Sequence, residues 1–596
     1  MSTAILTGQP VPGSSIEGDL RSLGFDVRTA ADAAEAETLL AEVPFEERVA
    51  LVDARFVGHV HALRLGLTDP RFPLAAIPGA VTAQPAGRQA LTRAMARENS
   101  AGGGTTLVDS LADRILTALD ADGTDVHRPE LGSLVAAVPA DPQARNEARQ
   151  AVADVDDEAV RLKSAVKARD GFFTTYCISP YSRYIARWCA RRGLTPNQVT
   201  TASLLTALIA AACAATGTRG GFVAAGVLLI ASFVLDCTDG QLARYSLQYS
   251  TLGAWLDATF DRAKEYAYYA GLALGAARGG DDVWALALGA MVLQTCRHVV
   301  DFSFNEANHD ATANTSPTAA LSDKLDSVGW TVWVRRMIVL PIGERWAMIA
   351  VLTAATTPRI TFYALLIGCA FAATYTTAGR VLRSVTRRAQ RTDRAARALA
   401  DLADSGPLAH FLSRIARGKG FARAYLAFVG AAGVVLGAAA APYGSWTPVL
   451  GATFYALISV PALASPLKGS LDWLVPPFFR AGEYLTVLVL AAKADVNGAL
   501  PAAFGLVAAV AYHHYDTVYR IRGNAGAPPA WLVRSLGGHE GRTLLVTVLA
   551  ALLTASQFTV ALTALAVAVA LVVLVESIRF WVSAGAPAVH DEGEPA

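Results

Sequence analysis

Apolar and polar positions divide the chain into a largely polar first third and an apolar remainder that begins after Pro196. A helix needs about 20 apolar residues to cross a bilayer. Two sets of six such stretches are predicted, and we therefore expect a polytopic α-helical membrane protein. The first set lies near 198–217, 221–243, 252–278, 283–303, 338–357 and 359–380. A polar linker is predicted at 383–421, after the first set. The second set, in which several members are short or interrupted, lies near 422–441, 446–465, 482–496, 499–518, 543–557 and 558–580.

Residues 1–147 alternate short apolar runs with amphipathic stretches. Strands are predicted at 4–8, 25–28 and 49–53, and helices at 14–23, 31–41 and 106–119. Strands that alternate with helices predict a parallel, doubly wound α/β sheet. The turn after the first strand contains Gly8, Pro10, Pro12 and Gly13. It could bind phosphate at a helix N-terminus, but its spacing fits neither a dinucleotide fingerprint nor a P-loop, so a plain strand-to-helix turn is the alternative.

Basic residues suggest how the chain meets the membrane. Residues 148–195 combine Arg and Lys with amphipathic spacing, which predicts a helix leading onto the membrane surface. Arginines flank the first set of spans, 196–382, on both sides, and the positive-inside rule then puts both ends of this bundle, with the N-terminal domain, in the cytoplasm. The alternative is that these charge runs are simply solvated faces. The arginines concerned are Arg183, Arg187, Arg191 and Arg192 before the bundle, and Arg380, Arg383, Arg387, Arg388 and Arg391 after it.

Composition narrows the class of function. Charged residues make up 17% of the 596 residues, against about 25% in soluble domains, and 53% are hydrophobic, which disfavours a purely soluble enzyme. Lys and Arg number 51 against 50 Asp and Glu, so no basic excess supports nucleic-acid binding. The six cysteines are scattered without a C-x-x-C pair, and we expect reduced thiols with no disulfide framework and no zinc site.

Four aspartates stand out where the second predicted span ends and the third begins. Asp236 and Asp239 are three residues apart and share a helix face, while Asp257 and Asp261 are four apart on one stripe. If the two helices are antiparallel neighbours, their carboxylates converge. Such charge near hydrocarbon needs a cation, and oxygen ligands select Mg²⁺ or Mn²⁺. The alternative is a set of interfacial loop aspartates among small helix-packing residues.

Together with nearby small residues, the aspartates form a longer motif. From Asp236 to Asp261 the chain reads D-x-x-D-G-x-x-A-R-x8-G-x-x-x-D-x-x-x-D. This resembles the signature of the CDP-alcohol phosphotransferase family at every specified position. The run 194–200 is similar to the family's entry to its first span, and the six-span layout through about 382 agrees with it. The resemblance implies an enzyme that transfers a phosphatidyl or phospho-alcohol group from a CDP-alcohol to an alcohol, releases CMP and acts in phospholipid biosynthesis.

The resemblance also implies roles for individual residues. Asp236, Asp239 and Asp257 would hold Mg²⁺ or Mn²⁺, and Asp261 would complete the metal site and act as the base that deprotonates the acceptor. Arg244 and the metal would stabilise the leaving CMP. The residues implied for CDP binding are Asn197, Thr200, Gly240, Ala243, Arg244 and Gly253.

The acceptor is open on the sequence alone. Basic residues that could bind an anionic acceptor could equally set topology or contact lipid headgroups. CDP-diacylglycerol is the favoured donor, because a site at a membrane surface suits a lipid. The run 167–183 is similar to the surface helix of the inositol-phosphate-using branch of the family, which makes inositol phosphate a candidate acceptor. The resemblance to the family also implies a homodimer. The candidate acceptor-binding residues are Arg297, His298, Arg335, Arg336 and Arg380.

Two other classes of function stay open. One is a cation-coupled transporter, although the aspartates lie near one end of the spans and transporter sites usually lie near the midplane. The other is a non-catalytic membrane scaffold that recruits partners through its N-terminal domain. That domain lacks the glycine-rich turn with a basic residue that a fused cytidylyltransferase needs.

The C-terminal membrane region, 422–596, contains one internal similarity. Residues 255–266 align without gaps to 473–484 and share seven of twelve positions, with Val475 and Phe479 at the two aspartate positions. A His-x-x-Asp pair also recurs at 298–301 and 513–516. A duplication whose second copy has lost the metal site, and which packs as a pseudo-partner, is one hypothesis. Chance is the other, because true repeats usually extend further.

Overall fold

The computed structural model describes residues 2–9, 11–100, 110–167, 170–311, 337–386, 390–413, 423–463 and 465–583. The chain divides into two compact units. One unit contains Met1–Ala168, Tyr181–Pro196 and Thr238–Ser250, and the other contains Arg169–Pro180, Asn197–Cys237 and Thr251–Ala596.

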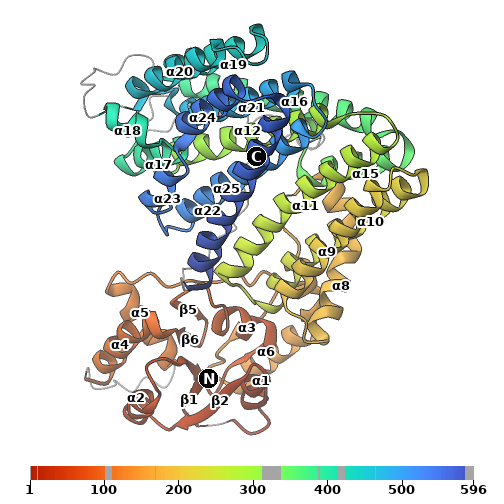
Figure 1. Ribbon diagram of the computed structural model, residues 1–596. Coiled ribbons are helices and arrows are strands. Elements are labelled where there is room, and N and C mark those ends of the chain that lie inside the picture. Colours follow the sequence, from red (N-terminus) through yellow and green to blue (C-terminus); the bar gives the residue numbers. More distant parts are fainter. Residues whose placement is uncertain are drawn as a thin grey trace. The chain divides into compact units, whose positions relative to one another are not determined.

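The N-terminal domain has a five-stranded sheet in the order β2-β1-β3-β6-β5 (Figure 1). The α/β class is confirmed, and β1 pairs in parallel with β2 and β3. The expectation of an all-parallel sheet is wrong at β6, which is antiparallel to both β3 and β5. Only Pro78 and Gly79 join β5 to β6, and a two-residue turn allows a hairpin but no crossover. The strands are β1 (Ser2–Thr7), β2 (Phe25–Ala30), β3 (Arg48–Asp53), β5 (Leu74–Ile77) and β6 (Ala80–Ala83), with a separate pair β4 (Val57–Gly58) and β7 (Ala136–Ala137).

Helices cover both faces of this sheet. Alternate strand residues point to opposite faces, so Ile5 and Leu51 pack in one core and Leu6 and Val52 in another. The first core also contains side chains of α2, α4 and α5, and the second those of α1 and α3. The predicted helix at 106–119 corresponds to α5, and Pro10 of the first turn lies outside the described residues. The helices are α1 (Ile16–Ser22), α2 (Ala33–Glu42), α3 (Val60–Leu67), η1 (Pro85–Gly87), α4 (Arg88–Ser100) and α5 (Leu111–Ala121).

The segment before the membrane helices is not the single helix that we expected. It forms α6 (Pro142–Ala153), α7 (Asp157–Ser164), a π-helical turn η2 (Thr174–Ile178) and α8 (Ser179–Arg191). The break before α7 has a local cause. The Asp156 side chain accepts the backbone N–H groups of Glu158 and Ala159, which is an N-cap that starts a new helix.

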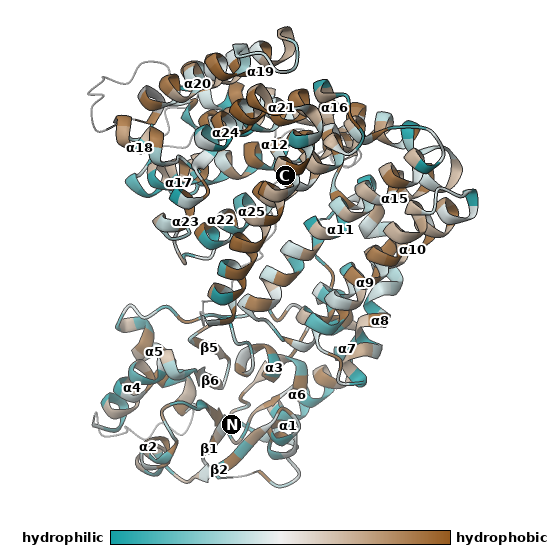
Figure 2. Cartoon of the chain, in the orientation of Figure 1, coloured by the Kyte–Doolittle hydropathy of each residue, from teal (hydrophilic) through white to brown (hydrophobic). Residues whose placement is uncertain are grey.

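Each of the twelve predicted membrane stretches corresponds to a helix. Six helices in the described ranges are long and apolar enough to cross a membrane, which indicates a multi-pass membrane protein: α9, α10, α16, α19, α21 with its leading turn η3, and α25. Figure 2 shows hydrophobic residues along α10, α20 and α25. The other predicted spans are shorter or more polar. The first set comprises α9 (Pro196–Ala215), α10 (Arg219–Ser246), α11 (Thr251–Arg278), α12 (Trp284–Asn308), α15 (Ile342–Ala355) and α16 (Pro358–Thr386). The second comprises α19 (Arg423–Ala440), α20 (Thr447–Leu463), η3 (Asp472–Leu474), α21 (Val475–Ala494), α22 (Ala499–Arg522), α24 (Gly538–Leu552) and α25 (Ala555–Ser583).

The predicted linker at 383–421 is partly helical. It contains α17 (Asp393–Ala403) and α18 (Pro407–Ser413), and a short helix α23 (Ala530–Ser535) precedes α24. Leu399 and Leu402 of α17 are buried, so this segment packs as part of the fold.

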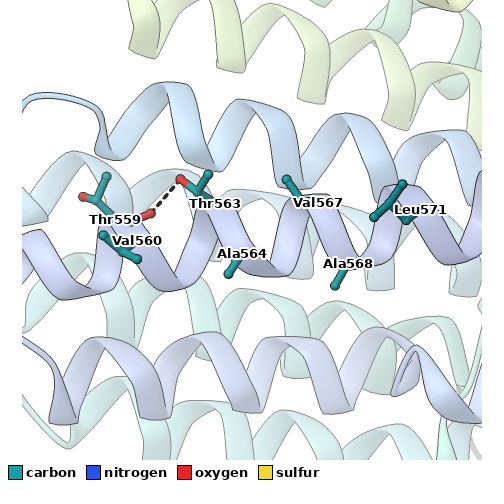
Figure 3. A pocket seen from close by; sticks show the side chains of 7 residues that line it. All are labelled: Thr559, Val560, Thr563, Ala564, Val567, Ala568 and Leu571. Atoms are coloured by element: carbon teal, nitrogen blue, oxygen red, sulfur yellow. Dashed lines mark hydrogen bonds between the residues drawn. The ribbon is translucent and has the colours of Figure 1, made fainter.

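A shallow apolar groove follows the surface of α25 (Figure 3). Its Val560, Val567 and Leu571 side chains are exposed, and α25 is the most hydropathic of the candidate spans. An apolar groove on such a helix suits lipid chains. It is lined by Thr559, Val560, Thr563, Ala564, Val567, Ala568 and Leu571.

Candidate active site

Three of the four motif aspartates converge. Asp236 lies near the C-terminal end of α10, and Asp257 and Asp261 lie in the first three turns of α11. One carboxylate oxygen from each comes within 4.8 Å of the others. The convergence predicted for neighbouring helices is therefore present for these three residues.

A buried lysine, which the sequence analysis did not single out, joins this group. The Lys264 ammonium lies 2.9 Å from Asp261 Oδ1 and also forms an ion pair with Asp236. It donates a further hydrogen bond of 3.2 Å to Ser203 Oγ, and its side chain is fully buried. The available signal was its spacing, since residue 264 lies three positions after Asp261 and seven after Asp257 on the same helix face.

The three carboxylates fit a divalent cation. Mg²⁺ and Ca²⁺ hold oxygen ligands at about 2.0–2.6 Å, so ligands on opposite sides of one ion stand about 4–5 Å apart. The oxygens within 4.8 Å of one another meet that condition. Lys264 supplies one positive charge against three negative ones, which leaves a net negative site. The donor set is all oxygen, as Mg²⁺ and Mn²⁺ prefer.

The rest of the motif continues along α10. Asp239 follows Asp236 by three residues and is buried. The three atoms nearest to a Cβ at Gly240 would all belong to the Arg244 guanidinium, the closest at 3.5 Å, so ordinary van der Waals space is left beside Gly240. Arg244 Nε donates to the Ala165 carbonyl at 2.6 Å. This part of α10 could accept a flat ligand close to its backbone, next to a cationic group.

Helices α7 and α8 hold the end of α10 in place. Arg161 Nε donates to the Tyr245 carbonyl at 2.8 Å, and its guanidinium lies 3.5 Å from the centre of the Tyr245 ring. Ser182 Oγ donates to Gln241 Oε1 at 2.8 Å in a buried contact. Burial, assisted by the nearby Arg64, lowers the pKa of Arg161 to about 10. Sequence reasoning did not anticipate these contacts, because they join residues about 60 to 85 positions apart.

The remaining residues implied for CDP binding lie at helix ends. Asn197 and Thr200 are in the first turns of α9, where Thr200 is buried and the Asn197 carbonyl accepts a hydrogen bond from Thr201. Gly253 is in the first turn of α11 and is half-buried, as is Ala243 on α10. Their role in nucleotide binding stays a prediction.

The candidate acceptor-binding residues differ in their surroundings. Arg297 on α12 is buried and donates to the Val339 carbonyl, and its Nε and Nη1 atoms have no hydrogen-bond partner among the described residues. Arg380 forms an ion pair with Asp301. The His298 ring contacts Gln294 at 2.7 Å and Tyr515 at 2.6 Å, so both its nitrogens are engaged. The other two candidates, Arg335 and Arg336, lie outside the described residues.

A second ionic group supports α11 next to the carboxylates. Glu265 pairs with Arg262 at 2.9 Å and with Arg345 of α15 at 3.2 Å. Tyr269 donates to the same carboxylate at 2.6 Å. Since Glu265 lies one turn after Asp261, these contacts fix the rotation of α11 about its axis and thereby the direction of its aspartates.

Comparison with known proteins shows which family this part of the chain resembles. Residues 193–373 match the family model described as CDP-alcohol phosphatidyltransferase. We therefore call this segment the CDP-alcohol phosphatidyltransferase-like domain. It contains the whole aspartate motif and Lys264. Residues 393–596 match a different model, described as a family of unknown function (DUF5941).

Relatives of the CDP-alcohol phosphatidyltransferase-like domain come from bacteria and archaea. A phosphatidylinositol phosphate synthase of Streptomyces avermitilis is 35% identical over 131 residues, which is 21% of this chain and 51% of that protein. An archaetidylinositol phosphate synthase of Pyrococcus horikoshii is 31% identical over 113 residues, 19% of this chain and 58% of that protein. A bifunctional IPC transferase and DIPP synthase of Aquifex aeolicus is 32% identical over 114 residues, 19% of this chain and 26% of that protein. The chain thus spans between 26% and 58% of the length of these relatives.

Proposed function

We propose that the chain is a membrane enzyme that transfers the phosphatidyl group of CDP-diacylglycerol to an inositol phosphate and releases CMP. The observation that carries this proposal is the convergence of three motif carboxylates around a buried lysine, within a domain of the matching family. The acceptor rests on the names of two relatives, a phosphatidylinositol phosphate synthase and an archaetidylinositol phosphate synthase.

The residues divide the reaction between them. The acceptor hydroxyl oxygen attacks the phosphorus that carries the diacylglycerol, its proton passes to the Asp261 carboxylate, and the bond from that phosphorus to the bridging oxygen breaks as CMP leaves. Lys264 holds Asp261 in position through its 2.9 Å ion pair. A divalent ion held by Asp236, Asp239 and Asp257, with Asp261 beside it, would supply charge neutralisation at the pyrophosphate.

The nucleotide would lie against the small-residue face of α10 and α11. Arg244 would contact its phosphates, since an arginine offers several N–H donors to phosphate oxygens. Arg297, whose buried guanidinium keeps two unpartnered nitrogens among the described residues, is the acceptor-binding candidate that the geometry favours. The other residues of the proposed nucleotide pocket are Asn197, Thr200, Gly240, Ala243 and Gly253.

The proposal includes a topology. All twelve membrane helices would span the cell membrane, with the N-terminal domain and the ends of the first bundle in the cytoplasm, as the flanking arginines favour. The homodimer that the family resemblance implies would form through a face other than the one between the two sets of helices, because the second set packs on the first within the same chain.

The test is CMP release by the purified protein in detergent, with CDP-diacylglycerol and Mn²⁺ or Mg²⁺. Inositol phosphate should support release and glycerol phosphate should not, and EDTA should abolish it. Asp261→Asn should lower the rate by about 10²-fold or more, as expected for loss of a general base. Asp281→Asn is the matched control, since Asp281 lies beyond the other end of α11 and pairs with Arg359. Cation flux in liposomes without CMP release would instead indicate a transporter, and neither activity a scaffold.

A further inference from the structure

The second set of membrane helices repeats the order of the first. We call residues 170–386 the first module and residues 404–583 the second module. Helices α19 to α22, α24 and α25 follow the sequence of α9 to α12, α15 and α16. The last two helices of each module nearly match in length, with 14 and 29 residues in the first and 15 and 29 in the second. In the aligned segment, residues of the second module lie 218 positions after those of the first.

The buried glutamate of α11 has a counterpart in the second module. Glu483 lies 218 residues after Glu265 and is likewise buried. It pairs with Arg480 at 3.0 Å, three residues earlier, as Glu265 pairs with Arg262. Both residues of each pair lie within the twelve aligned positions, so this similarity adds nothing beyond the alignment itself.

The partners from the fifth helices extend the similarity beyond that segment. Arg542 of α24 pairs with Glu483 at 2.5 Å, as Arg345 of α15 pairs with Glu265. Arg542 lies 197 residues after Arg345. A chance match of twelve residues gives no reason for a distant arginine to recur on the corresponding helix.

The fourth and sixth helices show a second repeated contact. Asp301 of α12 pairs with Arg380 of α16. Asp516 of α22, 215 residues later, accepts a hydrogen bond of 2.7 Å from Ser577 of α25. Ser577 lies 197 residues after Arg380, the same offset as between the two fifth-helix arginines. The offset is therefore the same for these two pairs of residues.

A third contact joins the start of each module to its fifth helix. Glu344 of α15 accepts the backbone N–H of Phe173, at 3.2 Å. Glu540 of α24 accepts the backbone N–H groups of Gly406 and Ala409, at 3.1 and 3.0 Å. Glu540 lies 196 residues after Glu344, one fewer than separates the two fifth-helix arginines, so the contact recurs on the corresponding turn and not at the corresponding position. In both modules a fifth-helix glutamate thus holds the segment that precedes the first membrane helix.

The contact face between the modules is reciprocal. Trp255, at the start of α11, stacks on Trp581 of α25, with ring centres 6.0 Å apart. Its aligned counterpart Trp473 donates from Nε1 to Ser384 Oγ of α16, at 3.0 Å. Ser384 and Trp581 are each the 27th residue of their 29-residue helices. When residue i contacts j′ and i′ contacts j, the interface is isologous, which is the property of a twofold-related pair.

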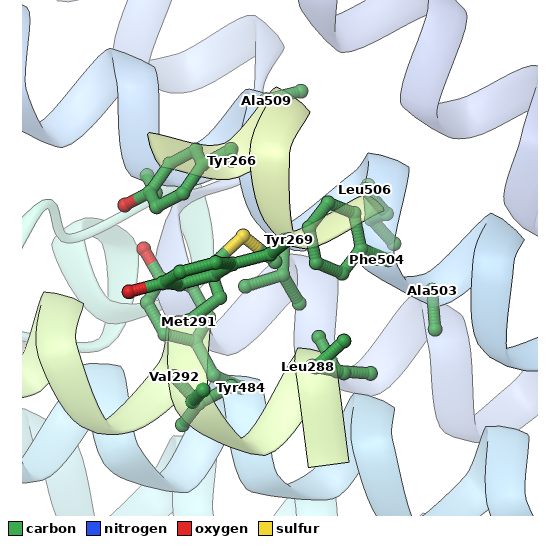
Figure 4. Packing of buried hydrophobic residues seen from close by; sticks show 14 of the residues in the cluster. Tyr266, Tyr269, Leu288, Met291, Val292, Tyr484, Ala503, Phe504, Leu506 and Ala509 are labelled. Carbon is green, nitrogen blue, oxygen red and sulfur yellow. The ribbon is translucent and has the colours of Figure 1, made fainter. Parts of the chain in front are cut away.

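The two modules also share a core. Tyr269 and Met291 of the first module and Tyr484 and Phe504 of the second belong to one cluster of buried residues (Figure 4). The two modules therefore bury apolar side chains against each other across their contact.

The second module has lost the reactive groups together. The positions of Asp257 and Asp261 are taken by the buried Val475 and Phe479. The position of Lys264 is taken by Gly482, where a Cβ atom would lie 2.9 Å from the Ala431 side chain. Once the carboxylates are gone, a buried lysine has no partner and is costly, so its loss accompanies theirs.

We infer that the second module is a degenerate copy of the first, and that it serves within the same chain as the twofold partner of the catalytic module. Its Trp581 packs on Trp255 of α11, two residues before Asp257. The hydroxyl of its Tyr515 forms a hydrogen bond with the ring of His298 on α12. The second module thereby supports the helix that carries the carboxylates. This inference concerns the fold and does not depend on the activity proposed above.

Crosslinking of the full chain tests both parts of the inference. Two double variants are made in a cysteine-free background, Trp255→Cys with Trp581→Cys and Trp473→Cys with Ser384→Cys, and are treated with a short bismaleimide. Both pairs should crosslink within one chain, so that the product keeps the mass of a single chain and mass spectrometry finds the two joined peptides. The matched controls are co-expressed single variants, which place the two cysteines on different chains and should give no two-chain product.

Two results would overturn the inference. One is a two-chain product from the co-expressed single variants, which would show that the contact forms between chains. The other is crosslinking of one pair without its reciprocal, in variants that elute as the wild type does in size-exclusion chromatography. A density map of the unmodified protein provides a second test, because rotation by about 180° should superpose the modules. If Glu265 did not then fall on Glu483, and Asp301 on Asp516, the second module would not be a copy.

Discussion

Replacement of Lys264 by methionine tests whether the three carboxylates form a metal site. The substitution keeps the length of the side chain and removes the only cation in contact with Asp236 and Asp261 among the described residues. At 2.9 Å and an effective dielectric constant of about 20, one such charge pair has a Coulomb energy of about 6 kcal/mol. Because desolvation offsets part of this energy, removing one partner of a buried pair costs about 3–5 kcal/mol.

The substitution should therefore lower the free energy of unfolding of the metal-free protein. A divalent ion at the same carboxylates replaces the lost positive charge, so Lys264→Met should bind metal more tightly than the wild type does. A difference of about 3–5 kcal/mol corresponds to a factor of about 10² to 4 × 10³ in Kd. The variant should therefore unfold earlier than the wild type in EDTA and recover much of the difference when Mn²⁺ is added.

The assay is thermal unfolding in detergent with EDTA or Mn²⁺, together with calorimetric titration of Mn²⁺. Lys493→Met is the matched control, since the Lys493 ammonium contacts the backbone carbonyls of Ala439 and Ala441. This control should leave the Kd for Mn²⁺ unchanged. If Lys264→Met bound Mn²⁺ no more tightly than the wild type, the reasoning that these carboxylates share one cation would be refuted.

Two further predictions concern the nucleotide face and the N-terminal domain. Gly240→Ala should fold normally, because its Cβ would lie no closer than 3.5 Å to the nearest side chain, and should raise the KM for CDP-diacylglycerol several-fold. The contrasting variant is Gly226→Ala, whose Cβ would lie 2.5 Å from the Ala350 carbonyl oxygen and which should lower the Tm. An unchanged KM in Gly240→Ala would show that the nucleotide does not bind at this face. Burial lowers the pKa of His61 from 6.5 to about 4. Between about pH 6.5 and 4 the His61 ring is therefore protonated in the unfolded chain but not in the folded domain. The free energy of unfolding should thus fall by up to about 3 kcal/mol as the pH drops from about 6.5 to 4. Urea unfolding of His61→Leu should not show this decrease. If the two proteins had the same pH dependence, His61 would not be its source.

The sequence by itself determined the elements and the motif. Each of the twelve apolar stretches became a helix, because hydrophobic length is a local property that no distant contact needs to supply. The aspartate spacing likewise determined which carboxylates share a helix face, and the short connection between α10 and α11 brought Asp236 to Asp257 and Asp261. The α/β class of the N-terminal domain followed from its alternating strands and helices.

Only the tertiary structure decided which distant groups meet. The tight turn at Pro78 and Gly79 reversed β6 within the sheet, and α7 contacts the end of α10 through Arg161, although neither follows from a periodic pattern. Lys264 could be assigned to the carboxylates only when its burial was known, since a lysine at helical spacing is equally suited to a solvated face.

The relation between the two modules shows the same division. Twelve aligned residues allowed duplication and chance alike. The constant offsets between Arg345 and Arg542, and between Arg380 and Ser577, have meaning only because their contacts recur in space. A packed fold tolerates a change of side chain at a contact more readily than a change in where the contact lies. The positions of contacts can therefore be preserved after the residues that make them have changed. The sequence therefore determined the local elements and the chemistry that they carry, and the three-dimensional packing decided which of those elements form a pair.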